Sequence, residues 1–600
     1  MAVQILRTLL GIILVLAVAC GTAEAPDPTA APAAQAPLAS PDPAARPTEE
    51  AEQPAPTATP ISQPTVTPSS SDMISARDSI TLVVGAEPVV ANPLLPIGAG
   101  TTTPLIKDNL VDPLTWQSAD DLRIVPTTAT ESWKQLDPET WRFQLREGVT
   151  FHNGEGWNAQ AALPTLNFQG IVGNENSSVG YTGSFTAEAV GEYTLDINCD
   201  DPCPIFPQTS VFLNFEAPEF YTSAPEAELA GRAVGFGPYK QVEWTPGVSF
   251  TQEAHEDYVP AGDHFEFQKP LIPNVTWLWR AETTVMTAMV EAGEADIAWD
   301  VGVDAVEALG DDQIKSGGSA EVYSFWFNTL WHPELKKKKV RQAIAHAVNC
   351  QELVDTLYGG FPPCRGNIIF PGVVGATEEN TAPYEYNPAL AKQLLQEADY
   401  NPQNVIRMGG RSARIPKQVE GYEAIHGYLT AVGMNIEIDV METAIWQELR
   451  QCAIGKAVNE VLEAQGKDPS TDEPTLADMQ AALDKGGSNC PTAHMLETGG
   501  VSSETLDFGR QVINYMNCIR PVSFVCDPSP GGIQEQIAPA LAASGEERRR
   551  RMGALADRLH DDVLFLSLFD LPVFYAVDPK LNWEPRFDRR IRVNTMWFSP

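Results

Sequence analysis

Apolar residues recur with two different periods along the chain, and the change of period separates the predicted strands from the predicted helices. The run Ser79–Val84 is short, apolar and followed by Gly and Pro, which is typical of a strand. Apolar residues at alternate positions predict another strand over 141–145, paired with the segment around Trp133 across a turn at 137–139. We expect the region from 193 to 215 to be rich in β-structure as well.

Helical spacing begins after residue 281. Val285, Met289 and Ala292 are separated by four and three residues, which predicts a helix that buries these three side chains on one face. Further helices are predicted near 336–348, 386–398 and 419–430, and further strands near 321–327, 405–408, 436–440, 493–496 and 564–571. Because helices alternate with strands, the body is predicted to be of the α/β class.

A capping pattern predicts where the last long helix begins. Ser544 and Glu547 have the S-x-x-E spacing of a capping box, which places the start of a helix just before Arg548. Four arginines in a row, at 548–551, follow this start, and we expect them to form a solvated face.

The first twenty residues predict export. Arg7 precedes an unbroken run of apolar residues and glycine from Leu9 to Ala19, and eleven such residues are too few to cross the roughly 30 Å core of a bilayer as a helix. The segment resembles a bacterial lipoprotein signal, which implies a signal peptide at 1–19 and lipid attachment at Cys20. An ordinary secretory signal with a chance cysteine is the alternative.

Residues 20–77 are dominated by Ala, Pro, Thr, Ser and Gln and contain almost no large apolar side chains. Such a segment cannot bury a core, so after the lipidated cysteine it is predicted to be a disordered tether. The remainder of the 600 residues exceeds what one hydrophobic core usually supports, which predicts at least two lobes.

Acidic residues outnumber basic ones, with 79 Asp and Glu against 40 Lys and Arg, and the formal net charge is −39. A surface of this sign repels phosphate backbones, so we expect no nucleic-acid partner. The acids are scattered rather than blocked, which favours a solvated acidic surface over the alternative of a cleft that selects cations.

Eight cysteines remain after Cys20, and they lie as neighbours along the chain. In an exported protein they predict four local disulfides: Cys199 with Cys203, Cys350 with Cys364, Cys452 with Cys490, and Cys518 with Cys526. Other connectivities stay open, because spacing alone does not decide the pairing. No C-x-x-C pair is present, which argues against a zinc site.

Motifs of enzymes are missing from the sequence. It contains no G-x-S-x-G, H-E-x-x-H, Walker A or G-x-G-x-x-G pattern. His255 and His264 suggest a metal site, but they fall in a loop with turn residues. We therefore predict no catalytic residues, no cofactor and no metal, with an enzyme as the competing class.

One ordered stretch carries a family resemblance. Trp133 followed by the run Phe143–Gly154, which reads FQLREGVTFHNG, resembles a motif of the family 5 extracellular solute-binding proteins, the peptide- and nickel-type binders of ABC importers. Further pieces follow in that family's order: Gly237-Pro238-Tyr239 through Trp244, Trp279-Arg280, Glu291 to Ile297, Asn328, Val340 to Ile344, and Tyr358-Gly359. The resemblance extends from about Ile80 to the C-terminus.

This resemblance implies a bilobal class II periplasmic-binding-protein-like fold with an extra subdomain inserted in the N-terminal lobe. Lobe I would contain 78–325 and 572–600, with the inserted subdomain at about 122–227. Lobe II would contain 326–571, with an insertion of its own at about 453–489. Two crossings, near Phe325–Asn328 and Pro572–Val577, would serve as the hinge.

The resemblance also implies a function. The chain would be a monomeric, lipid-anchored protein on the extracytoplasmic face of the membrane that captures short peptides by hinge closure. It would deliver them to an ABC permease and ATPase complex. An oligosaccharide, an opine or a metal chelate as the ligand, and a surface receptor without transport, are the alternatives.

In peptide-binding relatives an acid of the second lobe, often in a W-x-x-D-Y motif, takes the ligand ammonium. This chain lacks that motif, and Glu504 or Asp507 is nearest to the role. Glu87 would contact the other end of the ligand or a cationic side chain of it. Arg411 and Arg414 are candidates for a ligand carboxylate, because guanidinium is a bidentate donor.

Trp326 and Trp446 could form walls of the pocket. For each aromatic residue, ordinary core packing is the alternative, and for each acid it is a role at the surface or in helix capping.

Overall fold

The computed structural model describes residues 74–95, 102–119, 121–171, 179–262, 264–310, 312–317, 319–412, 414–486, 494–498, 501–502, 504–520 and 522–600. The predicted signal peptide, Cys20 and nearly all of the predicted tether lie outside these residues. None of the helices in the described part of the chain has both the length and the apolar character that a membrane crossing requires.

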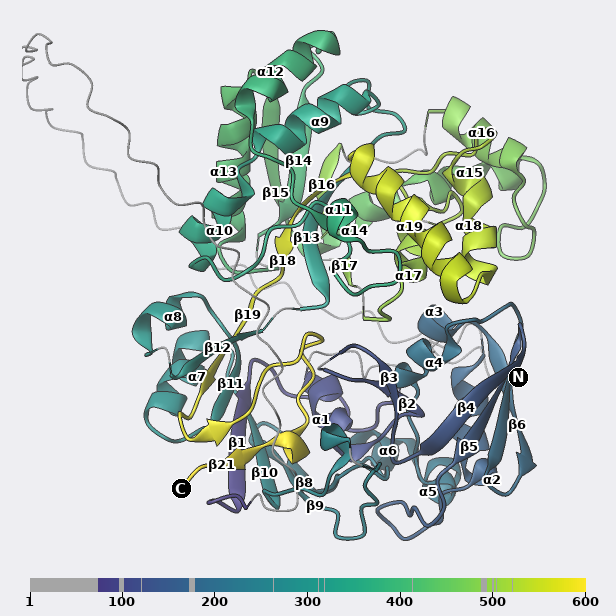
Figure 1. Ribbon diagram of the computed structural model, residues 1–600, viewed down its shortest axis with the longest axis vertical. Helices are drawn as coiled ribbons and strands as arrows, with labels where there is room; N and C mark the ends of the chain where they lie inside the picture. The colour runs from purple at the N-terminus through teal and green to yellow at the C-terminus, as the bar shows by residue number, and fades with distance from the viewer. Residues whose placement is uncertain are drawn as a thin grey trace, which may run out of the picture. The chain divides into compact units, whose positions relative to one another are not determined.

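A seven-stranded sheet forms the centre of lobe I, in the order β12-β19-β11-β1-β10-β9-β8 (Figure 1). The predicted strand β1 (Ser79–Val84) is confirmed and is parallel to both of its neighbours. Its side chains alternate between two cores, with Leu82 on one face of the sheet and Val83 on the other. The other strands are β8 (Tyr239–Thr245), β9 (Ser249–Ala254), β10 (Asn274–Trp279), β11 (Ile297–Val301), β12 (Ile314–Gly317) and β19 (Val573–Val577).

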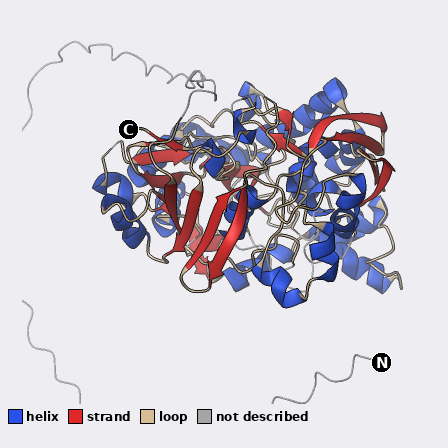
Figure 2. Ribbon diagram, turned by 90° about the horizontal axis from the view of Figure 1, so that it is seen from below, coloured by secondary structure: helices blue, strands red, loops and turns tan. Residues whose placement is uncertain are grey.

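A second sheet forms the centre of lobe II, in the order β15-β14-β16-β13-β17 with β18 paired to β13. All the strands predicted for this part of the chain are confirmed, with ends shifted by a few residues. Residues of helices, such as Val340 and Ile425, share a core with strand residues of this sheet, such as Phe325. Figure 2 shows the helices of the chain in blue and its strands in red, seen from below. The strands are β13 (Glu321–Phe327), β14 (Ile406–Arg411), β15 (Ile436–Met441), β16 (Met495–Glu497), β17 (Val501–Ser502) and β18 (Phe565–Asp570).

The chain passes from lobe I to lobe II between β12 and β13 and returns between β18 and β19. We expected the first passage near Phe325–Asn328, but it lies a few residues earlier because β13 pairs within the second sheet along its whole length. The two passages are joined where the N–H of Leu571 donates to the carbonyl of Glu321 at 2.9 Å.

The predicted helices of lobe II are confirmed as α9 (Lys338–Ala347), α12 (Pro388–Glu397) and α13 (Gln418–Ala431). The remaining helices outside the regions treated below are α1 (Thr102–Leu110), α5 (Pro218–Ser223), α6 (Glu226–Gly231), α8 (Asp304–Ala308), α10 (Cys350–Tyr358), α11 (Glu378–Thr381), α14 (Thr443–Gln451), α17 (Gly509–Gln511) and α18 (Ile533–Ala542). Short strands complete the fold: β2 (Thr115–Gln117), β3 (Ile124–Pro126), β20 (Leu581–Asn582) and β21 (Trp597–Phe598).

The subdomain inserted in lobe I is built on a four-stranded antiparallel sheet, in the order β4-β5-β7-β6. The predicted hairpin is confirmed, because Trp133 on β4 lies opposite Phe143 on β5. Its strands are β4 (Thr130–Asp137), β5 (Thr140–Leu145), β6 (Phe185–Gly191) and β7 (Thr194–Cys199), and its helices include α2 (Ala159–Gln169) and α3 (Val179–Thr182).

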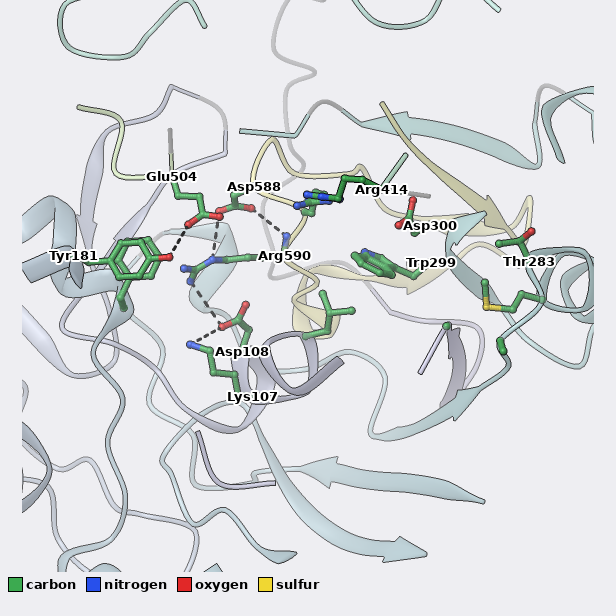
Figure 3. A pocket seen from close by; sticks show the side chains of 16 residues that line it. Lys107, Asp108, Tyr181, Thr283, Trp299, Asp300, Arg414, Glu504, Asp588 and Arg590 are labelled. Atoms are coloured by element: carbon green, nitrogen blue, oxygen red, sulfur yellow. Dashed lines mark hydrogen bonds and ion pairs between the residues drawn. The ribbon is translucent and has the colours of Figure 1, made fainter. Parts of the chain in front are cut away.

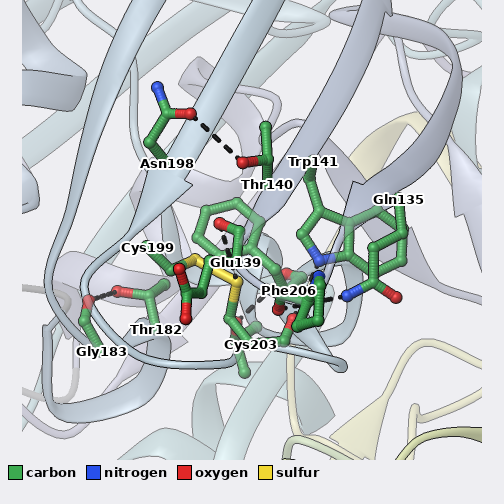
Figure 4. Close-up of a disulfide and its surroundings, with 12 residues drawn as sticks. Gln135, Glu139, Thr140, Trp141, Thr182, Gly183, Asn198, Cys199, Cys203 and Phe206 are labelled. Atoms are coloured by element: carbon green, nitrogen blue, oxygen red, sulfur yellow. Dashed lines mark hydrogen bonds between the residues drawn. A yellow bond between two sulfur atoms is a disulfide. The ribbon is translucent and has the colours of Figure 1, made fainter.

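The prediction of β-structure over 193–215 was wrong beyond Cys199. A disulfide joins Cys199 to Cys203, and the indole N–H of Trp141 donates to the carbonyl of Cys203 at 2.9 Å (Figure 4). The chain then forms α4 (Phe206–Thr209) and a 3₁₀ turn, with Pro207 in the first turn of α4 where proline is favoured. A short apolar run of this kind fits a buried helical turn as well as a strand.

Helix α7 (Thr283–Glu291) is confirmed, but the prediction of its buried face was wrong by one position. Met286, Met289 and Val290 are buried, whereas Val285 is 42% exposed. The reason is that the helix packs on the seven-stranded sheet through the core that contains Val83.

Helix α19 (Gly545–Asp561) begins where we predicted, but the capping box does not form, because the side chain of Ser544 makes no capping hydrogen bond to the described helix. The prediction of four solvated arginines was wrong for Arg548. Its guanidinium is buried and binds Asp507 with two contacts, Nε to Oδ2 at 2.7 Å and Nη2 to Oδ1 at 2.6 Å. The other three arginines pair with Glu546 and Glu547 at the surface.

The predicted insertion at 453–489 contains α15 (Ile454–Ala464) and α16 (Leu476–Asp484), which share a small core. The predicted disulfides Cys199–Cys203, Cys350–Cys364 and Cys518–Cys526 are present. Cys490 lies outside the described residues, so its pairing with Cys452 stays a prediction.

Replacing Asp507 with Asn should lower the free energy of unfolding by about 3–5 kcal/mol, because the buried guanidinium of Arg548 loses its counter-charge. Chemical denaturation checks this value, with Glu437→Gln as an exposed acid that should change nothing. A second substitution, Arg548→Met, should recover part of the loss by removing the unpaired charge. Equal stability of Asp507→Asn and the wild type would show that the ion pair is energetically neutral.

A buried carboxyl in the inserted subdomain predicts a dependence of stability on pH. Glu216 is fully buried, its Oε2 accepts the N–H of Val234 at 2.6 Å, and its Oε1 has no hydrogen-bond partner among the described residues. Burial raises the pKa of this carboxyl to about 8. The unfolded chain, with an ordinary pKa of about 4.3, releases the proton first as the pH rises.

Stability of the wild type should therefore fall as the pH rises from about 4.3 to about 8, by at most about 1.4 kcal/mol per pH unit from this group. Glu216→Gln imitates the protonated carboxyl and removes this loss, so its advantage in Tm should grow across that window. The exposed Glu219→Gln is the control. A Tm difference that is the same at both ends of the window would contradict the assignment.

Candidate functional site

A cavity of about 620 Å³ lies among residues that both lobes contribute. Lobe II supplies Arg414, from the loop after β14, and Glu504, from the loop after β17. The cavity is lined by Gly85, Leu105, Lys107, Asp108, Tyr181, Phe212, Ala281, Thr283, Met286, Trp299, Asp300, Arg414, Glu504, Asp588, Arg589 and Arg590. Its wall therefore carries four carboxylates and four cations, which gives it both signs of charge.

One end of the cavity contains Glu504, Tyr181, Arg590, Asp108 and Lys107 (Figure 3). The hydroxyl of Tyr181 donates to Oε2 of Glu504 at 3.5 Å. Oδ1 of Asp108 forms ion pairs with two cations: it lies 3.4 Å from Nζ of Lys107 and 3.8 Å from Nη1 of Arg590. The contact from Tyr181 on α3 joins lobe I to lobe II, whereas those of Asp108 join α1 to the C-terminal loop within lobe I.

Burial and neighbouring charges act in opposite directions on the pKa values of the two cations at this end. Burial lowers the pKa of Lys107, and the neighbouring Asp108 acts in the opposite direction. Burial alone would also lower the pKa of Arg590, but nearby carboxylates raise it above its ordinary value. For Tyr181, burial and the charge of Glu504 both raise the pKa, so its hydroxyl remains a neutral donor.

The other end contains Trp299, Asp300, Thr283 and Arg414 (Figure 3). Trp299 and Asp300 belong to β11, and Thr283 begins α7. Arg414 donates from Nη2 to Oε2 of Glu321 at 2.9 Å. The two ends thus differ, since one is a network of charges and the other combines charge with apolar surface.

Glu321 also holds a second guanidinium of the cavity. Arg589 donates from Nη2 to Oε1 of Glu321 at 3.0 Å. Because Arg414 comes from lobe II and Arg589 from the C-terminal loop of lobe I, one carboxylate at the start of β13 links both walls of the cavity.

Two of the residues that line this cavity have left-handed backbone conformations. Among the described residues, seven other than glycine have a positive φ, and two of them, Asp300 at 58° and Arg589 at 61°, line the cavity. Lys417 at 54° and Leu506 at 53° lie within three residues of the two lining residues from lobe II. Strained conformations of this kind cost of order 1 kcal/mol each and gather at functional sites.

The structure brings two of the seven predicted ligand residues, Glu504 and Arg414, to the cavity. A contact of either with a ligand stays a prediction. Asp507 is three residues from Glu504, but it is fully buried, its carboxylate binds Arg548, and its Oδ1 also accepts the N–H of Gly509 at 2.7 Å.

Arg411, Trp446 and Trp326 lie in the interior of lobe II and are not among the residues that line the cavity. Arg411 pairs with the buried Glu497 at 2.9 Å, and its guanidinium lies 3.9 Å from the ring centre of Trp446. The rings of Trp446 and Trp326 are stacked at 6.2 Å, and each residue is 2% exposed. Here the aromatic pair packs the core, which was the alternative interpretation of these residues.

Glu87 is engaged within lobe I. Its Oε1 accepts the indole N–H of Trp244 at 3.1 Å and the backbone N–H of Gly247 at 2.9 Å. This carboxylate therefore holds the turn between β8 and β9, and it is not among the residues that line the cavity.

The predicted loop histidines do not form a metal site in the described part of the chain, where no three His, Cys, Asp or Glu residues are grouped to hold an ion. His255 instead packs edge-on against His152 at 4.9 Å between ring centres. Burial lowers the pKa of both rings, to about 3 for His152.

Sequence reasoning missed most of the lining residues, above all Asp300 and those of the C-terminal loop. A signal for the loop was visible, because four arginines fall within the seven residues 586–592 and alternate with Asp588 and apolar side chains. No comparable signal marked Asp300, whose position depends on how β11 is paired.

A comparison with protein families matches residues 123–471 to the bacterial extracellular solute-binding proteins, family 5 Middle. Among curated proteins, the glutathione-binding protein GsiB of Escherichia coli (strain K12) is 25% identical over 277 residues, which are 44% of this chain and 51% of that protein. The chain thus spans about half the length of the curated relatives it matches.

Solved structures resemble the chain over most of its length. The ABC transporter substrate-binding protein CtaP from Listeria monocytogenes has a TM-score of 0.68 at 16% identity, over 87% of this chain and 99% of that one. The periplasmic binding protein DppA from Helicobacter pylori, in complex with the peptide STSA, has a TM-score of 0.61 at 19% identity, over 87% and 98% of the two chains.

These likenesses establish the fold as the bilobal, class II periplasmic-binding-protein-like architecture with a subdomain inserted in lobe I. The family match covers more than half of the chain. The chain therefore belongs to the bacterial extracellular solute-binding proteins, family 5.

Proposed function

We propose that this protein is the substrate-binding component of an ABC importer and that it captures a short peptide in the cavity between its lobes. The observation that carries the proposal is the composition of the cavity wall, in which four carboxylates and four cations surround about 620 Å³. This volume is in the range of small-molecule sites, and a peptide offers charges of both signs at its two ends. The peptide and glutathione ligands in the names of similar proteins support the same ligand class.

Two residues of lobe II, Glu504 and Arg414, would bind the two charged ends of the ligand. Glu504 would receive the ligand ammonium, because its carboxylate lines the cavity, where Tyr181 donates to its Oε2. Arg414 would receive a carboxylate with the guanidinium donors that Glu321 leaves available.

Ligand capture would favour closure of the lobes. Glu504 and Arg414 belong to lobe II, while the other lining residues belong to lobe I, so a ligand in the cavity contacts both. A ligand shifts an open–closed equilibrium only through contacts that differ between the two states, and contacts to both lobes exist only when the lobes are close.

Anchoring and delivery complete the proposal. Cys20 would carry the lipid, the segment 20–77 would act as a tether on the extracytoplasmic face, and a permease with its ATPase would receive the ligand from the monomeric binder. The bound solute would be released unchanged, because we propose binding without catalysis.

Native mass spectrometry of the purified protein tests the ligand class directly. We expect a mixture of peptides or one small cationic metabolite that leaves on denaturation. A tightly held oligosaccharide or metal chelate would overturn the peptide assignment while leaving the binding function in place.

Replacing Glu504 with Gln should weaken the binding of trialanine by about 1.5–3 kcal/mol, because the ligand ammonium loses a charged hydrogen-bond partner. Isothermal titration calorimetry measures this loss, and N-acetyl-trialanine, which has no ammonium, should bind both proteins equally. Glu437→Gln, at an exposed position of lobe II, is the matched control. Unchanged affinity of Glu504→Gln for trialanine would reject the role of this carboxylate.

A further inference from the structure

Asp300 interrupts a strand at the edge of the cavity. Strand β11 pairs with β19, and the register shifts between Trp299 and Val301, which makes Asp300 the extra residue of a β-bulge. Its φ of 58° is left-handed, a conformation that costs free energy for residues other than glycine. A bulge redirects a side chain from the normal alternation of a strand, and here the side chain lines the cavity (Figure 3).

The carboxylate of Asp300 has no ion pair or hydrogen bond within the described residues, although guanidinium groups are close enough to affect it. Burial raises its pKa, while the charges of Arg589 and Arg414 act to lower it. Both of these arginines are paired with Glu321, at 3.0 Å and 2.9 Å. Asp300 thus lies in the positive electrostatic field of two arginines, but neither guanidinium forms an ion pair with it.

The surroundings of Asp300 match a cation on an apolar stem. Trp299 lines the same end and supplies aromatic surface, which attracts cations. Thr283 and Met286 are three residues apart on α7, so they lie on one face of that helix and both line the cavity. The end of the cavity that contains the carboxylate therefore also contains an aromatic ring and a hydroxyl group.

We propose that Asp300 binds the basic side chain of a lysine- or arginine-containing peptide, whose methylene stem packs on Trp299. This inference rests on the proposed function and adds a second acidic subsite to it, at the end of the cavity away from Glu504 (Figure 3). The ligand class becomes a short cationic peptide, with one positive group for each of the two carboxylates.

The test compares Ala-Lys-Ala with Ala-norleucine-Ala, which keeps the stem and lacks the charge, by isothermal titration calorimetry. We expect the wild type to bind the lysine peptide about tenfold more tightly or better. Asp300→Asn should abolish this preference and leave the affinity for the norleucine peptide unchanged. Glu294→Gln, an exposed acid just before β11, should keep the preference.

The outcomes separate the two proposals. Equal affinity of the wild type for the two peptides, or a preference that survives Asp300→Asn, would overturn the subsite and leave peptide capture intact. Failure of both peptides to bind the wild type would overturn peptide capture, and the subsite with it.

A measurement without ligand tests the same residue. Because Asn tolerates the left-handed conformation and carries no buried charge, Asp300→Asn should raise the Tm of the ligand-free protein. A clear fall in Tm would assign Asp300 a structural role and contradict the proposal.

Discussion

The carboxylate of Glu321 is the contact on which the arrangement of the cavity depends. It lies where the chain enters lobe II, and it binds Arg414 of lobe II and Arg589 of lobe I at once. Its backbone carbonyl accepts the N–H of Leu571, so the returning passage is tied to the same residue. Because the two guanidiniums share this one carboxylate, they contribute positive field at Asp300 without pairing with it.

Apolar groups are concentrated inside each lobe, whereas many charged groups lie at the boundary between the lobes. Each lobe has its own apolar cores around its sheet, whereas half of the sixteen residues that line the cavity between the lobes carry charged side chains. A buried ion pair regains in attraction little more than it loses in desolvation, so such a boundary holds the lobes less firmly than apolar packing would. The pair of Lys417 with Asp304 at 3.2 Å adds little, because the Asp304 side chain is 77% exposed. Firm lobes with a polar boundary are what hinge closure requires.

A feature could be predicted from the sequence when the residues that determine it lie close together along the chain. The strands that begin at Ser79 and Glu321 were predicted because their apolar pattern is complete within a few residues. The partner of Arg548 could not be predicted, since Asp507 reaches it through the packing of distant segments. The candidate site followed the same rule, because Glu504 was found through family resemblance and the acid in the bulge of β11 had no local signal.

The left-handed residues show which departures from regular structure belong to the cavity. Asp399 and Val563 follow the ends of α12 and α19, where a left-handed residue is an ordinary way to end a helix. Asp300 has no such explanation, because it lies inside a strand whose pairing continues on both sides. A sequence that keeps an unpaired acid in a strained conformation gives up stability at that position, and local rules are broken in this way mainly where function requires it. The cationic subsite proposed for Asp300 accounts for this strain, which the pairing of the surrounding strands does not explain.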